Sequence, residues 1–89
     1  MFYKLKDGFI VRKIGKQCMA VPVGQQTSQI HGMIALSESA ELLWNALEKG
    51  AEEEQLVDII TDVYEIDRER ALQDIKNFIE GLREQGALL

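Results

Sequence analysis

The side chains that most often carry out chemistry in proteins are scarce in this sequence. It contains one histidine, His31, and one cysteine, Cys18. A general acid or base needs a reaction partner and a group that orients it, and His31 lies beside Gly32 in a polar stretch that offers neither. Cys18 has no companion cysteine, so we interpret it as a thiol of the core rather than as a nucleophile.

The same scarcity argues against a metal or cofactor site. A tetrahedral zinc site needs four ligands, which one cysteine and one histidine cannot supply. We interpret the acidic run at residues 52–54 as the solvated first turn of a helix, and the isolated glycines form no phosphate-binding loop. We therefore expect no metal, no cofactor and no enzymatic activity.

The charge is distributed unevenly along the 89 residues, whose net charge is −5. The chain up to Leu36 has five basic side chains and one acidic side chain, whereas the chain from Ser37 onward has five basic and fourteen acidic ones. An acidic helical half repels the phosphate backbone, so we expect no nucleic-acid partner. The basic front half could attract an acidic peptide.

The N-terminal residues and the cysteine count bear on location. Residues 1–7 lack the continuous apolar segment of a secretory signal, and no run of about 18 apolar residues could cross a membrane. A single cysteine cannot form an internal disulfide, which suits a reducing compartment. We expect a single domain, residues 1–89, that is cytoplasmic and does not associate with a membrane.

The stretch from Gly32 to Gly50 joins two halves with different patterns. A short apolar run at 33–36 predicts a strand, and Ser37 is a suitable N-cap for the helix that follows. Gly50 can end that helix because glycine adopts the left-handed C-terminal conformation at little cost. The apolar residues of the helix recur at the spacing of one helical face: Ala40, Leu43, Trp44 and Leu47. We expect Trp44, the largest apolar side chain, in the core shared by both halves.

The segments on either side complete an α+β fold. Residues 9–14 and 17–23 are rich in strand-forming residues, with Met19, Val21 and Val23 on one side of the second strand. Gly15-Lys16 between them predicts a type II′ hairpin turn. Two more amphipathic helices follow, one opening at residues 52–54 and one from Asp67 to Gly86, and residues 88–89 should fold back onto the core. A three-stranded antiparallel sheet followed by three helices is typical of a winged helix-turn-helix.

With catalysis, metal binding and nucleic-acid binding disfavoured, the sequence predicts a surface that binds a peptide. The short strand at 33–36 should lie at the edge of the sheet, and an open edge is a template for an added strand. The third helix could leave an apolar groove beside that edge, with Lys76 placed to pair with an acidic side chain of the peptide. Ile34→Pro should weaken peptide binding if the added strand pairs there. The expected binding residues are Met33, Ile34, Ala35, Leu36, Leu72, Ile75, Lys76 and Ile79.

Two other functions are compatible with the same fold. A winged-helix regulator of transcription would need basic and amide side chains on its recognition helix. The third helix carries four basic residues, but four acidic residues offset them, which disfavours DNA binding. A structural subunit of a larger enzyme would bury the same helical faces permanently. The oligomeric state, monomer or dimer, stays open because an exposed edge can also pair with a second copy.

Several short motifs resemble the PqqD family. The pattern in that family is roughly Val-Pro-Val-Gly, followed by Gly-Met-Ile-x-Leu-Asn-Glu-Thr-x-x-x-Leu-Trp. The chain departs from it in having Ser37 for the usual asparagine and Ser39 for the usual threonine, and both replacements retain side chains that can cap a helix. The matching residues are Val21-Pro22-Val23-Gly24, Gly32-Met33-Ile34, Leu36-Ser37-Glu38-Ser39-Ala40, Leu43-Trp44 and Tyr64-Glu65-Ile66-Asp67.

The resemblance implies a specific peptide and a specific partner. Members of that family are peptide chaperones for ribosomally made peptides that are modified after synthesis. Their partner is usually a radical S-adenosylmethionine enzyme, which carries the metal cluster itself. The leader of the precursor adds as a strand to the third strand and lies beside the third helix, which maps onto the binding residues named above. The resemblance therefore implies a precursor-recognition domain that presents the leader peptide to a modifying enzyme.

Overall fold

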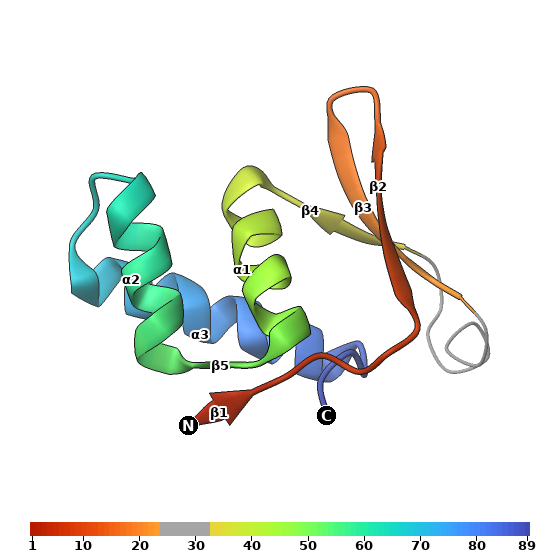
Figure 1. The fold of residues 1–89 in the computed structure, drawn as a ribbon. Coiled ribbons are helices and arrows are strands. Elements are labelled where there is room, and N and C mark those ends of the chain that lie inside the picture. Colours follow the sequence, from red (N-terminus) through yellow and green to blue (C-terminus); the bar gives the residue numbers. More distant parts are fainter. Residues whose placement is uncertain (24–32) are drawn as a thin grey trace.

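The computed structural model describes residues 1–23 and 33–89, and the predictions for Gly24, His31 and Gly32 lie outside them. Its helices gather on one side of a three-stranded sheet, whose β2–β3 hairpin extends away from them (Figure 1). This is the α+β fold expected from the sequence. The elements are β1 (Phe2–Tyr3), β2 (Phe9–Ile14), β3 (Gln17–Pro22), β4 (Ile34–Leu36), α1 (Glu38–Lys49), β5 (Ala51–Glu52), α2 (Glu53–Val63) and α3 (Arg68–Glu84).

The larger sheet has the strand order β2-β3-β4 with both pairs antiparallel. Its hairpin turns at Gly15, which has a φ of +64°, and no non-glycine residue in the described part of the chain, Lys16 included, has a positive φ. A type I′ turn needs positive φ at both central residues, whereas a type II′ turn needs it only at the first. The backbone therefore agrees with the predicted type II′ turn at Gly15-Lys16.

The two faces of this sheet bury different residues. Cys18 and Ala20 of β3 and both ends of β4, Ile34 and Leu36, are at most 7% exposed and belong to the core. Side chains alternate between the faces of a strand, so Met19 and its alternate neighbours lie on the opposite face. The residues that the sequence placed together on one side of the strand are therefore on the face turned away from the core, while Cys18 is a core thiol, as predicted.

The turn from β4 into α1 follows the sequence prediction closely. The Ser37 side chain accepts a hydrogen bond of 3.2 Å from the backbone N–H of Ala40, which caps the helix. The apolar stripe of α1 faces the core, where Trp44 is only 1% exposed. Its indole packs edge-on against the ring of Phe9 at a centroid distance of 5.4 Å. This aromatic pair connects α1 to the first strand of the sheet.

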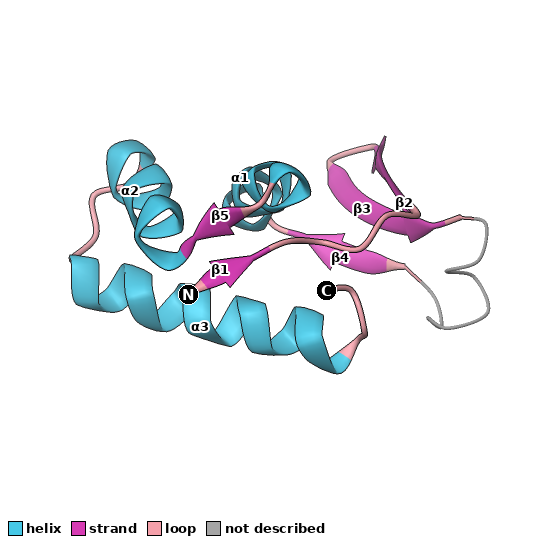
Figure 2. Ribbon diagram, turned by 60° about the horizontal axis from the view of Figure 1, so that its bottom comes forward, coloured by secondary structure: helices cyan, strands magenta, loops and turns pink. Residues whose placement is uncertain are grey.

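A second, two-stranded sheet formed by β1 and β5 was not predicted. Phe2 pairs with Glu52 and Tyr3 with Ala51, and Figure 2 shows this ribbon beside the helices, apart from the larger sheet. Each strand has two residues, which is too short for alternating hydrophobicity to be visible in the sequence. Because Glu52 belongs to β5, α2 begins one residue later than expected. The start of α2 is capped by the Gln55 side chain, which accepts a 2.7 Å hydrogen bond from the Glu52 N–H.

The last helix and the residues after it close the core. Asp67 precedes α3 in an extended conformation, as expected of an N-cap, although its side chain makes no capping hydrogen bond. Leu88 bridges Leu5 and is buried, whereas Leu89 is 81% exposed, so only the first of the two leucines returns to the core. No helix in the described part of the chain has the length and apolar character to cross a membrane.

Gly50 should not tolerate alanine. Its φ of +96° and ψ of 139° are a conformation that residues with a side chain rarely adopt, and an added Cβ would meet the ring of Phe2. Gly50→Ala should lower the free energy of unfolding by about 1–3 kcal/mol, as measured by urea denaturation. Gly81→Ala is the control, because a Cβ on this helical glycine meets nothing within 4 Å. It should stabilise the protein by about 0.5–1 kcal/mol, and equal effects of the two substitutions would contradict the argument.

Candidate functional site

Strand β4 lies at the edge of the three-stranded sheet and pairs only with β3. Beyond that ladder, no other backbone hydrogen bond among the described residues involves residues 33–36. Within residues 1–23 and 33–89, the outer edge of β4 is therefore open, as expected from the sequence. Its availability to another strand depends on which backbone groups point outward.

The hairpin turn determines the direction of the β3 backbone groups. A two-residue turn is closed by a hydrogen bond between the residues that flank it, which here are Ile14 and Gln17. Hydrogen-bonded and non-bonded pairs alternate along an antiparallel ladder. The backbone groups of Gln17 and every second residue after it therefore point toward β2, and those of Cys18 and Ala20 point toward β4.

The register then assigns the free groups of β4. Cys18 is opposite Leu36 and Ala20 is opposite Ile34, so Ile34 and Leu36 direct their N–H and C=O groups toward β3. Ala35 consequently directs its N–H and C=O toward the open edge. The expectation that Ile34→Pro would remove a donor to an added strand is thereby corrected, because that donor belongs to the ladder with β3. Ala35 is the residue whose N–H an added strand would use.

The opposite edge of the sheet, β2, is protected in a way that β4 is not. Natural proteins discourage strand addition with charged side chains on edge strands, lysine above all. Strand β2 carries Arg12 and Lys13, and Lys13 lies 3.7 Å from the Glu41 carboxylate of α1. Strand β4 carries only apolar side chains. The sheet therefore has one protected edge and one receptive edge.

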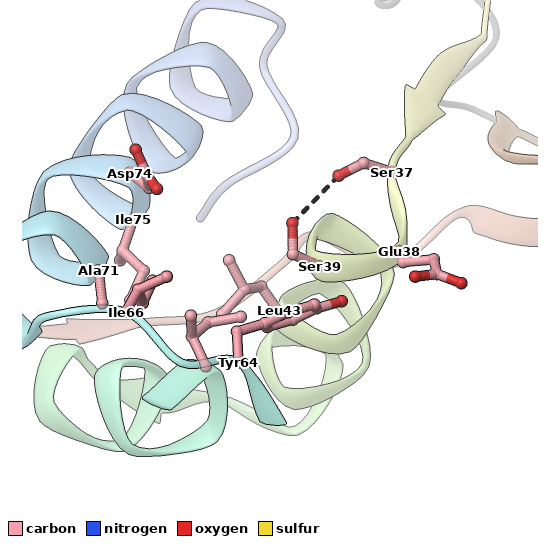
Figure 3. Close-up of a pocket in the computed structure, with 10 residues that line it drawn as sticks. Ser37, Glu38, Ser39, Leu43, Tyr64, Ile66, Ala71, Asp74 and Ile75 are labelled. Atoms are coloured by element: carbon pink, nitrogen blue, oxygen red, sulfur yellow. Dashed lines mark hydrogen bonds between the residues drawn. The ribbon is translucent and has the colours of Figure 1, made fainter. Parts of the chain in front are cut away.

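A pocket of about 450 Å³ begins where β4 ends. Ser37 and Ser39 at the start of α1 form one wall and are joined by a 3.2 Å hydrogen bond between their hydroxyl oxygens. Figure 3 shows the α3 residues on the opposite side, with Tyr64 and Ile66 between the two walls. The lining is mostly apolar: Ser37, Glu38, Ser39, Leu43, Ile60, Tyr64, Ile66, Ala71, Asp74 and Ile75. The pocket can therefore accommodate apolar side chains next to the open edge of β4.

The structure brings together only part of the expected binding set on α3. Ile75 lines the pocket but is 1% exposed, and Ile79 is 3% exposed in the core. The expectation that these side chains stay partly open is therefore wrong for both isoleucines, because α3 packs its apolar stripe against the other helices. Leu72 lines a separate hollow between α2 and α3, and the exposed Lys76 is not among the residues of the pocket. Direct contact of these four residues with a peptide stays a prediction.

Apart from Ile75, the binding residues expected from the sequence do not include those that line the pocket. Tyr64 and Ile66 lie in the segment between α2 and α3, and Ile66 is 36% exposed. The exposure of Ile66 depends on how this connection packs against the helices, so it cannot be read from the sequence. Asp74 places an exposed carboxylate at the pocket, 3.3 Å from Arg70. The groove therefore offers an acid where the sequence had suggested the base Lys76.

The charges on α3 do not form a surface for DNA. Arg68 pairs with Asp58 at 3.0 Å, Arg70 with Asp74 at 3.3 Å, and Arg83 with Glu80 at 3.1 Å. A recognition helix needs cations and amides that are free to contact phosphates and bases. Three of the four basic side chains of α3 are instead neutralised by carboxylates of the same protein.

Cys18 should react slowly with thiol reagents in the folded protein. Burial, together with the nearby Glu41 carboxylate, raises the pKa of its thiol, and Lys13 opposes this only in part. The thiolate therefore forms more readily in the unfolded chain, so this group favours folding below its unfolded pKa of about 8.5, and that contribution is lost as the pH rises through the folded pKa. Ellman's reagent at pH 8 should label the denatured protein fast and the native protein slowly, and equal rates would contradict a buried thiol.

Among residues 1–23 and 33–89, no group of three or more histidine, cysteine, aspartate or glutamate side chains is arranged to hold a metal ion. The site is thus described by a receptive strand edge and a mostly apolar pocket that also carries two carboxylates, Glu38 and Asp74. These features can bind a chain through its backbone and an apolar side chain.

Comparison with known proteins identifies a matching family model and a similar fold. The family model for coenzyme PQQ synthesis protein D (PqqD) matches residues 22–88. A solved structure described as TbiB1 in complex with the TbiA(beta) leader peptide is similar in fold, with a TM-score of 0.76 and 24% sequence identity, covering 96% of this chain and 93% of the other. No curated protein sequence matches this chain significantly.

Proposed function

The chain belongs to the PqqD family, and we propose that it is a non-catalytic adaptor that binds the leader of a ribosomally made precursor peptide. The leader adds as a strand to the open edge of β4. The observation that carries the proposal is the combination of that apolar, unprotected edge with the adjacent pocket. The similar structure of TbiB1 contains a leader peptide, which supports the same use of the fold here.

The geometry suggests how affinity and specificity are divided. Backbone hydrogen bonds from Ala35 supply affinity that is independent of sequence, because every peptide residue except proline has the matching groups. The pocket selects for a large apolar side chain near the end of the added strand, since only such a side chain fills the pocket and buries its apolar lining. Asp74 already pairs with Arg70, and Glu38 adds a second carboxylate to the pocket lining, so the remaining negative charge favours a basic residue next to that side chain.

The adaptor acts by bringing the precursor to a separate enzyme. Tethering raises the effective concentration of the peptide core at an active site without any new contact there. We propose that this enzyme is of the radical S-adenosylmethionine type and carries its own metal cluster. The assignment of a non-catalytic role is supported by the family and by a sequence that has one histidine and one cysteine.

Amide chemical shifts test the proposal. The ¹⁵N-labelled protein is titrated with the leader peptide of the precursor encoded beside its gene. The largest shifts should occur at residues 33–39, at Tyr64 and Ile66, and along the pocket side of α3. Shifts confined to the β1–β5 ribbon or the outer side of α2 would contradict the site, and an absence of binding would contradict the function.

A further inference from the structure

The three-stranded sheet has a second face that none of the described helices covers. Figure 1 shows every helix on one side of this sheet and none on the other. On the uncovered side, Ile10 is 43% exposed, Ile14 60% and Met33 53%. We call this side the outer face, and strand alternation and register place on it Ile10, Arg12, Ile14, Gln17, Met19, Val21 and Ala35, with Met33 immediately before β4.

The apolar character and the size of the outward side chains indicate that another surface packs against the outer face. An antiparallel sheet with one face in water usually alternates apolar inward with polar outward. Strand β3 has apolar side chains on both faces, and the larger ones face outward. The small Cys18 and Ala20 face the core, whereas Met19 and Val21 face away from it. Apolar residues on both faces are typical of a strand that is covered on both sides.

The charges around the outer face select the covering surface. No acidic residue occurs in 8–23 or 33–36, which include all of the three-stranded sheet, whereas Arg12, Lys13 and Lys16 lie on its hairpin. A matching surface is therefore apolar with an acidic rim. The helical half of another copy is acidic too, but such a head-to-tail contact uses two different surfaces and builds rings or filaments rather than a symmetric dimer. A different protein is the better match.

The outer face is also continuous with the site proposed for the leader peptide. A strand added beside β4 places every second side chain on the outer face, next to Met33 and Ala35. The bound leader would thus widen the outer face by one strand. A protein that docks there touches the adaptor and the leader at the same time.

We infer that the outer face is the docking surface for the modifying enzyme, and that the leader strand completes it. The inference rests on the proposed function and adds a coupling between the two ligands. Because binding linkage is reciprocal, the leader must strengthen enzyme binding by the factor by which the enzyme strengthens leader binding. An adaptor of this kind recruits the enzyme preferentially when it carries a precursor.

The test compares two substitutions of equally exposed apolar residues. Ile14 on the outer face is 60% exposed and Val63 on α2 is 58% exposed, so aspartate at either position should leave the protein folded. Biolayer interferometry measures the affinity of each variant for the purified modifying enzyme encoded beside the precursor gene, with and without saturating leader peptide. Fluorescence anisotropy with labelled leader peptide measures leader affinity separately.

Saturating leader should increase the affinity of the wild-type protein for the enzyme by about fivefold or more. Ile14→Asp should reduce enzyme affinity by about tenfold or more, because it replaces an exposed apolar side chain of the outer face with a carboxylate that an acidic surface repels. Its affinity for the leader should stay near that of the wild type, and Val63→Asp should leave both affinities near those of the wild type. Unchanged enzyme affinity in Ile14→Asp with normal leader binding would overturn the inference and leave the proposed function standing. A wild-type dimer that Ile14→Asp dissociates in sedimentation would overturn it in favour of a second copy. Failure of the wild type to bind leader would refute the proposed function itself.

Discussion

Ala35→Pro should weaken binding of the leader peptide by about 10- to 100-fold. The substitution removes the one β4 backbone donor that the hydrogen-bonding phase directs toward the open edge. It also leaves a carbonyl of the leader unpaired, which costs about 1–3 kcal/mol when that group is buried. Because Ala35 uses neither of its backbone groups in the ladder with β3, proline at this edge position should be compatible with the fold. Fluorescence anisotropy with the labelled leader peptide measures the change.

Two other substitutions on β4 make the result specific. Ala35→Thr keeps the N–H and has high strand propensity, so its leader affinity should remain within about threefold of wild type. Ile34→Pro removes a donor to β3 and should instead destabilise the sheet, which circular dichroism and urea denaturation would detect. If the Ala35→Pro variant unfolded and the Ile34→Pro variant stayed folded, the assignment would be reversed: the backbone groups of Ala35 would pair with β3 and those of Ile34 would face the open edge.

The backbone plan of this protein could be read from its sequence, because its signals are local. The Ser37 cap, the Gly15 turn and the apolar stripes of the helices each depend on residues within a few positions of one another. The β1–β5 ribbon could not be predicted, because two-residue strands have no periodicity and their pairing depends on chain segments far apart in sequence. The edge position of β4 could be predicted from its shortness and its place in the chain.

The candidate site was predictable in kind but not in detail. The apolar stripe of α3 has the same pattern whether it faces a groove or a core, and packing against α1 and α2 decided in favour of the core for Ile75 and Ile79. The pocket is formed by Tyr64 and Ile66, from a connection whose path no periodicity describes. The direction of the Ala35 backbone groups needs the register between strands, and register depends on three-dimensional pairing.

Trp44→Ala should have the largest effect on stability, a loss of about 3–5 kcal/mol in the free energy of unfolding. Trp44 is 1% exposed, and its indole packs against Phe9, so its removal would open a cavity between α1 and the sheet. A domain of this size has a total stability of only about 5–15 kcal/mol. Urea denaturation followed by far-UV circular dichroism measures the loss without relying on the fluorescence of this sole tryptophan.

Trp44→Phe separates the volume of the indole from its N–H group. The Trp44 Nε1 is buried and finds no hydrogen-bond acceptor among the described residues, and an unpaired buried donor costs about 1–3 kcal/mol. Phenylalanine loses part of the volume but also removes this donor and keeps an aromatic ring against Phe9. Trp44→Phe should therefore lose less than about 2 kcal/mol. A loss as large as that of alanine would mean that the indole N–H has an acceptor after all, and that the connection between α1 and the sheet depends on this polar contact as well as on packing.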